Sequence, residues 1–491
     1  MSTSLLESTP KGLRVHLVGA KGTGMAALAE ILAARGARLS GSDVPDVFYT
    51  DAILHAIGVP VYPGFDASRI DDSLDLVVHS AAYRRDQNPE LVEALRRGLP
   101  VLNYPEALGQ ISAGADSSGI SGVHGKTTTT AMTGAVLAAL GLPATVLAGS
   151  AVAAFGGRST LLKGSRYFVA ETCEYRRHFL AFHPRRIVLT SIESDHQDYY
   201  PSYEDIFAAF LEYIHRLPQG GELIFCADQE GARRAAERAA ADRPDLLLTP
   251  YGHRAEGPYR LVSYSSGEGR AAFRLAGFDR DFELHVPGEH LALDATAALA
   301  LSFALLKNER SRPPNEQELA AAAAALAGFG GSKRRSEILG EAGGILFMDD
   351  YGHHPTAIRE TIKGVRAFWP NRRLIVDFMA HTYSRTAALF DDFVASFDEA
   401  DMVVLHKIYA SARETQGSGP DGRRLFEALR NRRAAAGNPA EPLYFDEPLD
   451  ALEPLARLLR PGDLFLTMGA GDNWRLGSAL IERFREAERN A

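Results

Sequence analysis

The run Gly122–Thr130, Gly-Val-His-Gly-Lys followed by four threonines, constrains the fold of this chain more than any other feature. The residues that end at Ser121 predict a short strand before it, and Ala131–Leu140 predict a helix after it. Glycines leave backbone N–H groups free to face an anion, and the N-terminus of the following helix adds partial positive charge. The sequence therefore predicts an α/β domain with a polyphosphate-binding loop.

The individual residues of this loop suit ATP. We expect Lys126 to contact the outer phosphates and Thr127 to offer its hydroxyl to Mg²⁺. The full phosphate-loop pattern has a further glycine five residues before Gly125, where this chain has Ile120, so the match is to a shortened form. A glycine turn capped by threonines is the alternative. The nucleotide-contacting residues would be Gly122, Val123, His124, Gly125, Lys126, Thr127 and Thr128.

Length and composition bound the class of protein. A chain of 491 residues is too long for one hydrophobic core and corresponds to about three domains. The formal net charge of −9 argues against general nucleic-acid binding, although it is compatible with a local basic pocket for an anionic substrate. The chain has two cysteines, Cys173 and Cys226, which argues against a disulfide framework and favours a reducing compartment.

We expect no targeting or membrane segment. Residues Met1–Gly12 lack the basic start and the apolar run of a signal peptide. No charged residue occurs in Thr127–Gly157, but glycines and a proline interrupt that stretch, which predicts a buried helix and strand rather than a bilayer span. The sequence predicts a cytoplasmic protein and leaves a monomer and a homodimer both open.

A second glycine turn lies near the N-terminus. Arg14–Val18 predicts a strand, Gly19–Gly24 a turn and Met25–Arg35 a helix, and the acidic Asp43 follows the next strand. This order is typical of a dinucleotide-binding fold, in which an acidic residue after the second strand meets a ribose. Lys21 replaces the middle glycine, and its positive charge beside any pyrophosphate weakens the interpretation as a nicotinamide-dependent oxidoreductase.

Two further residues suit a metal ion beside the phosphates. Tyr167–Ala170 predicts a strand that ends at Glu171, and Arg186–Ile192 predicts another that leads to His196. Ligands of an open parallel sheet gather at the carboxyl ends of its strands, so both side chains would lie near the phosphate loop. A carboxylate and an imidazole there suit Mg²⁺ held between protein and phosphates. A packed histidine, and a helix-capping role for acidic residues such as Glu174, are the alternatives.

Seven sequence blocks together resemble the Mur ligases, the ATP-dependent amide-forming enzymes of peptidoglycan precursor synthesis. The resemblance extends over nearly the whole chain, and the blocks in order are far more specific than any one of them. They are Gly19–Glu30, His124–Thr127, Glu171–Phe179, Asp195-His196, Asp349–Thr356, His381–Thr386 and Ser411–Glu414.

The resemblance implies an α/β fold with three domains. An N-terminal Rossmann-like, UDP-sugar-binding domain would span residues 1–113. A central P-loop-type ATPase domain with a parallel sheet would span 114–331. A C-terminal Rossmann-like α/β domain, carrying amino-acid and nucleotide-closing residues, would span 332–491.

The resemblance also implies an activity. The lactyl carboxylate of UDP-N-acetylmuramate would attack the γ-phosphate of ATP, and the amine of L-alanine would then displace phosphate from the acyl phosphate. Every participant is anionic until the amine arrives, so the site needs fixed positive charge more than it needs a nucleophile. The partners would be these small molecules, with ATP and Mg²⁺ as cofactors and neither nucleic acid nor membrane.

Site residues follow from the same blocks. The catalytic set would be Lys126, His196, His353 and Arg385, and the metal ligands would be Thr127, Glu171 and His196. The residues that join the phosphate loop in binding nucleotide would be Asp294, Arg335 and Asp350. The substrate side would comprise Lys21, Gly22, Thr23, Gly24, Ser42, Asp43, Ser80 and His381.

The chain departs from the family pattern at the adenine end. Where the family has His-Asn-x-x-Asn, this chain has Leu291 and Asp294 at the two amide positions. Leucine cannot hydrogen-bond a base and a carboxylate cannot donate, so the nucleotide preference is open. Val123 replaces a threonine and Ser336 an aromatic residue. No lysine occurs between His196 and Gly220, which predicts that no carbamylated lysine is used.

Three alternatives stay open. A recycling ligase that adds a ready-made tripeptide to the same UDP-sugar shares the Asp349–Thr356 block but generally lacks His381–Thr386, whose presence favours L-alanine. The second alternative is an oxidoreductase that uses the turn Gly19–Gly24, but it would give no role to Lys126 or to the adjacent histidines His353 and His354. The changed adenine end would also suit a catalytically silent protein with the ligase fold.

Overall fold

The computed structural model describes residues 4–410, 420–437 and 440–490. The chain divides into two compact units. Unit 1 comprises Met1–Glu193, Ile206–Arg260 and Ala295–Ala325, and unit 2 comprises Ser194–Asp205, Leu261–Asp294 and Leu326–Ala491. The expected block Ser411–Glu414 lies outside the described residues.

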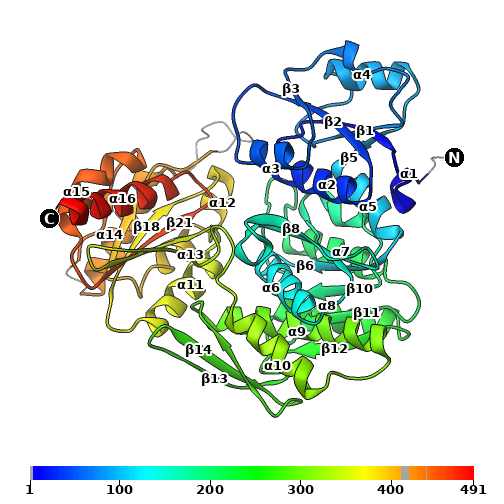
Figure 1. Cartoon of the computed structure of the whole chain (residues 1–491). Coiled ribbons are helices and arrows are strands. Elements are labelled where there is room, and N and C mark those ends of the chain that lie inside the picture. The colour runs from blue at the N-terminus through cyan, green and yellow to red at the C-terminus, as the bar shows by residue number, and fades with distance from the viewer. Residues whose placement is uncertain (1–3, 411–419, 438–439, 491) are drawn as a thin grey trace. The chain divides into compact units, whose positions relative to one another are not determined.

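Unit 1 begins with a five-stranded parallel sheet in the order β3-β2-β1-β4-β5 (Figure 1). The strand order reverses between β1 and β4, and a doubly wound sheet binds its ligand at the carboxyl ends of the strands at such a point. The turn Gly19–Gly24 leaves β1 at that edge. The elements are α1 Leu5–Ser8, β1 Arg14–Val18, α2 Thr23–Ala34, β2 Arg38–Asp43, α3 Thr50–Ala56, β3 Val61–Pro63, β4 Leu76–His79, α4 Pro89–Arg96, β5 Val101–Asn103 and α5 Tyr104–Ala113.

A seven-stranded sheet follows, in the order β12-β11-β10-β6-β9-β7-β8, and only the β7–β8 pair is antiparallel. The phosphate loop connects β6 to α6 at the carboxyl edge, between the strand β9 that ends at Glu171 and the strand β10. The elements are β6 Asp116–Ser121, α6 Lys126–Ala139, β7 Ala144–Val152, β8 Arg158–Leu162, β9 Tyr167–Glu171, β10 Arg186–Leu189, α7 Tyr203–Ile214, β11 Glu222–Cys226, α8 Glu230–Asp242, β12 Leu247–Tyr251, α9 Glu289–Arg310 and α10 Glu316–Ala327.

Unit 2 contains an antiparallel sheet, β13-β14-β15, and a six-stranded sheet, β16-β17-β21-β18-β19-β20, in which only the β16–β17 pair is antiparallel. Successive side chains of its central strands face opposite ways: Val376 and Leu466 pack with α11 and α14, whereas Ile375 and Phe465 pack with α15 and α16. Burial on both faces explains why these strands are almost wholly apolar.

The elements of unit 2 are β13 Leu261–Gly267, β14 Arg270–Leu275, β15 Asp281–Leu284, β16 Glu337–Ala342, β17 Ile345–Asp350, α11 Pro355–Phe368, β18 Arg373–Met379, α12 Tyr383–Ala388, α13 Phe390–Ala395, β19 Met402–Leu405, α14 Gly422–Ala435, β20 Leu443–Tyr444, α15 Leu452–Leu458, β21 Asp463–Gly469 and α16 Trp474–Asn490.

Two helices begin earlier than the sequence predicts. α6 starts at Lys126 rather than Ala131, and α2 starts at Thr23 rather than Met25. The first residues of both helices show no apolar periodicity, so the sequence pattern places each helix start too late. Each glycine turn therefore runs directly into its helix, and the first N–H groups of the helix face the turn.

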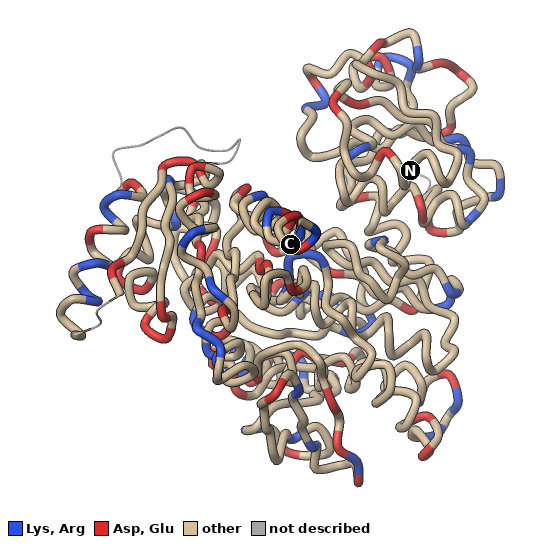
Figure 2. The backbone as a smooth tube through the Cα atoms, turned by 60° about the vertical axis from the view of Figure 1, so that its left-hand side comes forward, with Lys and Arg blue, Asp and Glu red and all other residues tan. Residues whose placement is uncertain are grey.

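The uncharged stretch Thr127–Gly157 forms most of α6, then β7 and a short turn, as expected for a buried helix and strand. Among the described residues, one helix, α9, is long and apolar enough to cross a bilayer, but most of its apolar part is buried inside the protein. Basic and acidic residues are interspersed along the backbone (Figure 2). The net negative charge therefore does not come from one acidic segment.

Candidate active site

Contacts to the end of β10 hold the phosphate loop in one shape. Gly122 has a φ of 137°, and a Cβ placed on it would lie 2.1 Å from the hydroxyl oxygen of Thr190. Ser191 accepts the N–H of His124 at 2.9 Å, and Thr190 donates to the His124 carbonyl. Gly125, with a φ of 79°, then turns the chain into α6. Glycine is required at Gly122 both by its φ and by this close approach.

Lys126 folds back onto its own loop. Its ammonium donates to the Gly122 carbonyl and lies 3.0 Å from Oε2 of Glu174, a carboxylate that is only 2% exposed. Burial acts to lower the pKa of Lys126, but the negative charges of Glu174 and Glu171 outweigh it, and the pKa is raised. The loop therefore carries a permanent cation.

Thr127 and Glu171 meet beside this lysine. The Thr127 hydroxyl donates to Oε2 of Glu171 at 2.8 Å. Gly149 of β7 makes room for the carboxylate, because a Cβ there would lie 2.3 Å from the same Oε2. The structure thus brings together two of the three predicted metal ligands, and both offer oxygen, the atom that Mg²⁺ prefers. The third, His196, belongs to unit 2.

The predicted sugar-nucleotide residues gather at the carboxyl edge of the five-stranded sheet. Asp43 accepts the Lys21 N–H at 2.7 Å and the Tyr83 hydroxyl at 3.0 Å. Burial and the Asp43 charge raise the pKa of Tyr83 to about 12. The Lys21 ammonium lies 3.1 Å from Asp51. The same edge carries Gly22, Thr23 and Gly24 after β1 and Ser80 after β4.

Ser42 is an exception among these residues. It is fully buried, and its hydroxyl donates to Glu90 of α4, which is buried as well. The expectation that the Ser42 side chain contacts the uridine does not hold in this structure, since the pleat turns it into the domain core. Glu90 also accepts from His16 at 3.3 Å and from Arg69 at 3.2 Å.

We expect Glu90→Ala to lower the free energy of unfolding by about 3–5 kcal/mol, because it leaves the buried Ser42 and His16 donors and the half-buried Arg69 guanidinium without this acceptor. Urea unfolding followed by circular dichroism measures the change. Glu93→Ala on the same helix is the control, since Glu93 pairs with Arg96 and Arg97 near the surface and little change is expected. Equal midpoints for the two variants would contradict this account of the core.

Unit 2 brings a second group of predicted residues together. The ring centroids of His353 and His381 are 5.8 Å apart, and Nη1 of Arg385 lies 3.1 Å from Nδ1 of His381. Arg385 also donates to the buried carboxylate of Asp195, the residue before His196. The His-Pro block, the His-Thr-Tyr-Ser-Arg-Thr block and the Asp-His pair therefore form one cluster.

The protonation of His353 follows from its surroundings. Its Nδ1 lies 2.8 Å from the Tyr351 carbonyl oxygen. A carbonyl only accepts, so Nδ1 carries the proton and Nε2 keeps its lone pair. Burial and the positive charge of Arg385 lower the pKa of His353 well below its usual value, despite the nearby Asp195. His353 is therefore a neutral imidazole.

Three predicted nucleotide residues lie in unit 2, outside the phosphate loop. The Arg335 guanidinium lies 5.0 Å from the ring centroid of Tyr351. The two carboxylate oxygens of Asp350 accept N–H groups of Gly352 and Ser336, each at 2.7 Å. The Ser336 hydroxyl lies 3.4 Å from the same carboxylate.

Asp294, the third of these residues, lies on α9. It is 7% exposed, and Leu291 one turn earlier is 5% exposed. Leu291 therefore packs in the protein interior, in agreement with its inability to hydrogen-bond a base.

Two acidic residues of the site, Glu174 and Asp195, were assigned no catalytic or ligand-binding role from the sequence. Glu174 was interpreted as a possible helix cap, but the helix that follows it has no side-chain cap hydrogen bond. Its partner is Lys126, and the partner of Asp195 is Arg385. Each pair joins positions far apart in the chain, so only membership of the family-like blocks could have indicated them.

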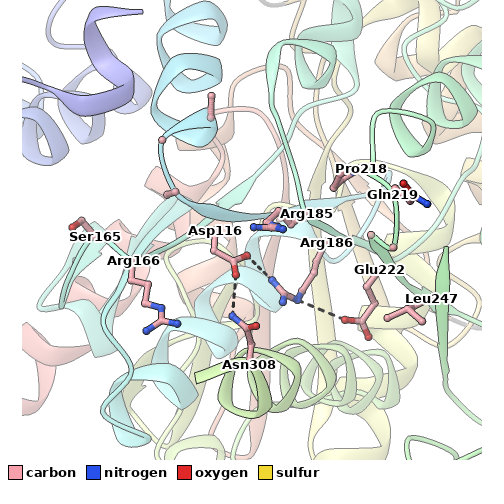
Figure 3. Close-up of a pocket in the computed structure, with 15 residues that line it drawn as sticks. Asp116, Ser165, Arg166, Arg185, Arg186, Pro218, Gln219, Glu222, Leu247 and Asn308 are labelled. Atoms are coloured by element: carbon pink, nitrogen blue, oxygen red, sulfur yellow. Dashed lines mark hydrogen bonds and ion pairs between the residues drawn. The ribbon is translucent and has the colours of Figure 1, made fainter. Parts of the chain in front are cut away.

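A polar hollow of about 660 Å³ lies at the other edge of the seven-stranded sheet, at the amino ends of β6, β10 and β11 (Figure 3). Arg186 lies 2.6 Å from Asp116 and 3.6 Å from Glu222, and Asn308 donates to Asp116 at 3.1 Å. Arg186, the central cation of the hollow, is therefore already paired with two carboxylates, unlike the anion-facing N–H groups of the phosphate loop.

Three family models match the chain in order. They are the Mur ligase family catalytic domain over residues 14–116, the Mur ligase middle domain over 120–302 and the Mur ligase glutamate ligase domain over 334–471. The chain belongs to the Mur ligase family and is an ATP-dependent ligase. The turn Gly19–Gly24 falls within the first model, which argues against the oxidoreductase alternative.

Two relatives and one solved structure that match nearly the whole chain share the name UDP-N-acetylmuramate--L-alanine ligase. The UDP-N-acetylmuramate--L-alanine ligase of Treponema pallidum (strain Nichols) is 52% identical over 99% of this chain and 100% of its own length. The ligase of that name from Borrelia garinii subsp. bavariensis is 38% identical over 94% of this chain and 97% of its own. The crystal structure of a UDP-N-acetylmuramate-alanine ligase from Thermotoga maritima covers 97% of this chain and 100% of its own, with a TM-score of 0.74 at 24% identity. This likeness confirms the three-domain α/β fold.

Proposed function

We propose that this protein joins L-alanine to the lactyl carboxylate of UDP-N-acetylmuramate at the expense of ATP. The observation that carries the proposal is the phosphate loop, in which a half-buried Lys126 and the Thr127–Glu171 pair lie side by side. The names of the full-length relatives support the choice of substrates.

The reaction has two steps. A carboxylate oxygen of the sugar attacks the γ-phosphorus of ATP, so that ADP leaves and an acyl phosphate forms. The amine of L-alanine then attacks the acyl carbon, and the tetrahedral intermediate expels phosphate as the amide forms and the ammonium protons are lost. Negative charge accumulates on phosphate oxygens in both steps, and fixed cations at the loop stabilise it.

Lys126 would bind the γ-phosphate through its ammonium group. Its ammonium is held by Glu174 at the mouth of the loop, and the N–H groups of Gly125 and Thr127 lie beside it at the start of α6. Thr128 and His124 would complete the cradle through their backbone, and the apolar Val123 would add no hydroxyl.

The residues present fit Mg²⁺. Thr127 and Glu171 supply oxygen ligands, Gly149 leaves space for the carboxylate, and His196 would act on a second metal ion. Bound Mg²⁺ would neutralise phosphate charge and bridge it to the protein.

The remaining predicted residues would bind three parts of the substrates: the UDP group, the ATP nucleotide, and the acyl group with the amino acid. Lys21, Asp43 and Ser80, with the N–H groups of the turn at Gly22–Gly24, would bind the UDP part. Arg335, with Asp350 shaping its loop, would lie on the nucleotide side with Asp294. His353, His381 and Arg385 would serve the acyl group and the amino acid.

One assay tests the proposal against its alternatives. Purified protein receives UDP-N-acetylmuramate and Mg-ATP with single amino acids or with the tripeptide, and ADP and product are followed. We expect ADP release that depends on L-alanine. Release that depends on the tripeptide alone would indicate a recycling ligase, and no amine-dependent release would indicate a silent protein.

The pH dependence should reflect His353. Because its pKa lies well below the usual value of about 6.5, its neutral form persists as the pH falls, and its contribution is lost only below that range. We expect the ratio of wild-type to His353→Gln single-turnover rates to stay constant from pH 8 to about 6.5 and to fall at lower pH. A midpoint at or above 6.5 would contradict the assignment of a neutral imidazole.

A further inference from the structure

Asp195 lies on the segment after β10 and is 5% exposed. Its Oδ1 accepts from Nε of Arg385 at 3.0 Å and from Nη2 at 2.7 Å, and it also accepts the N–H of His196 at 2.7 Å. Both Asp195 and Arg385 belong to unit 2.

Arg385 is equally buried and has only donors. Nη1 lies 3.1 Å from Nδ1 of His381, so this nitrogen must accept and the proton of a neutral His381 must sit on Nε2. Nη1 also lies 3.5 Å from the His381 carbonyl oxygen. Arg385 thus sets both the orientation of His381 and the atom that carries its proton.

Hydrogen bonds hold the turn between His381 and Arg385 in one conformation. Thr382 has a φ of 67°, which is unfavourable for a β-branched residue and persists only when its surroundings impose it. Its N–H donates to the Tyr409 carbonyl at 3.0 Å, and its own carbonyl accepts the Thr386 hydroxyl at 2.8 Å. The His381 ring stacks on Tyr409 with 6.0 Å between centroids. The Asp195 carboxylate contacts this segment through the Arg385 side chain.

We propose that Asp195 is a positioning residue for the amine-transfer step, acting through Arg385 to fix His381 as an Nε2–H donor. The proposal rests on the function proposed above, in which His381 and Arg385 serve the amino acid. In that step the Nε2–H group of His381 would donate a hydrogen bond to the carboxylate of the incoming α-amino acid. Asp195 does not touch the substrate.

Asp195→Asn keeps the size of the side chain and removes its charge. We expect the KM for L-alanine to rise about tenfold or more, because a charge-assisted pair is lost and Arg385 is free to reorient. Acyl-phosphate formation needs no amino acid, so exchange of oxygen between the bridging and non-bridging positions of ATP, measured with UDP-N-acetylmuramate alone, should stay within about threefold. Asp205→Asn, an exposed aspartate of the same segment, should change neither quantity.

A double-variant cycle tests whether Asp195 affects amide formation through Arg385. If Asp195 acts through Arg385, Asp195→Asn should add nothing to Arg385→Gln. Additive losses, or an exchange rate that falls as far as amide formation, would overturn the proposal and place Asp195 in the phosphoryl-transfer step beside His196. A wild-type enzyme without any amine-dependent activity would instead refute the proposed function.

Nitrogen NMR of histidine-labelled wild-type protein gives a test that needs no variant. We expect His381 to show protonated Nε2 and unprotonated Nδ1 at neutral pH. The opposite tautomer, or a doubly protonated ring, would overturn the proposal whether or not Asp195→Asn folds.

Discussion

Lys126→Ala is expected to reduce acyl-phosphate formation by about 10³-fold while leaving the binding of UDP-N-acetylmuramate nearly unchanged. Lys126 supplies the cation of the phosphate loop, whereas the predicted UDP-binding residues lie on a different sheet. Isotope exchange in ATP measures the first quantity, and calorimetric titration with the UDP-sugar measures the second.

The variant also removes the ion pair to the buried Glu174, which destabilises the protein by itself. The double variant Lys126→Ala, Glu174→Gln removes that charge and should recover thermal stability but not exchange. Lys163→Ala, at an exposed lysine of the same unit, should behave like wild type. Exchange restored by the double variant would mean that Lys126 is structural rather than catalytic.

Gly149→Ala is expected to lower kcat/KM by about 10²-fold, with a higher requirement for Mg²⁺. A Cβ at this position would lie 2.3 Å from Oε2 of Glu171, so the carboxylate must move away from Thr127. Initial rates over a range of Mg²⁺ concentrations measure the effect. Excess Mg²⁺ should restore part of the lost rate.

Gly267→Ala is the matched control for this substitution. Gly267 also lies in a strand and has no positive φ, and a Cβ placed on it would have nothing within 4 Å, so no effect on the rate is expected. Normal Mg²⁺ dependence in Gly149→Ala would show that Glu171 is not a metal ligand.

The sequence predicted the buried parallel strands well. Arg14–Val18 agrees with the structure residue for residue, and Tyr167–Glu171 forms the strand expected to end at Glu171, because such strands are largely apolar runs bounded by polar turns. The start of α6 was misplaced, because a run of threonines has no apolar periodicity.

The sequence predicted the part of the candidate site that depends only on where each strand ends. Thr127 and Glu171 each lie close to the end of a recognisable strand, and parallel strands bring their carboxyl ends together. Ser42 shows the limit of that argument. Its place beside Asp43 suggested a ligand contact, but the pleat of β2 turns it toward Glu90 on α4.

The sequence by itself determined the family, the order of the sheets and the phosphate loop, because each depends on short-range patterns of glycine, charge and apolar residues. The tertiary structure alone decided which charges pair. Lys126 with Glu174 and Arg385 with Asp195 are ion pairs between distant segments, and no local pattern encodes them. Burial makes these pairs necessary, since a charge taken out of water needs a partner close to it.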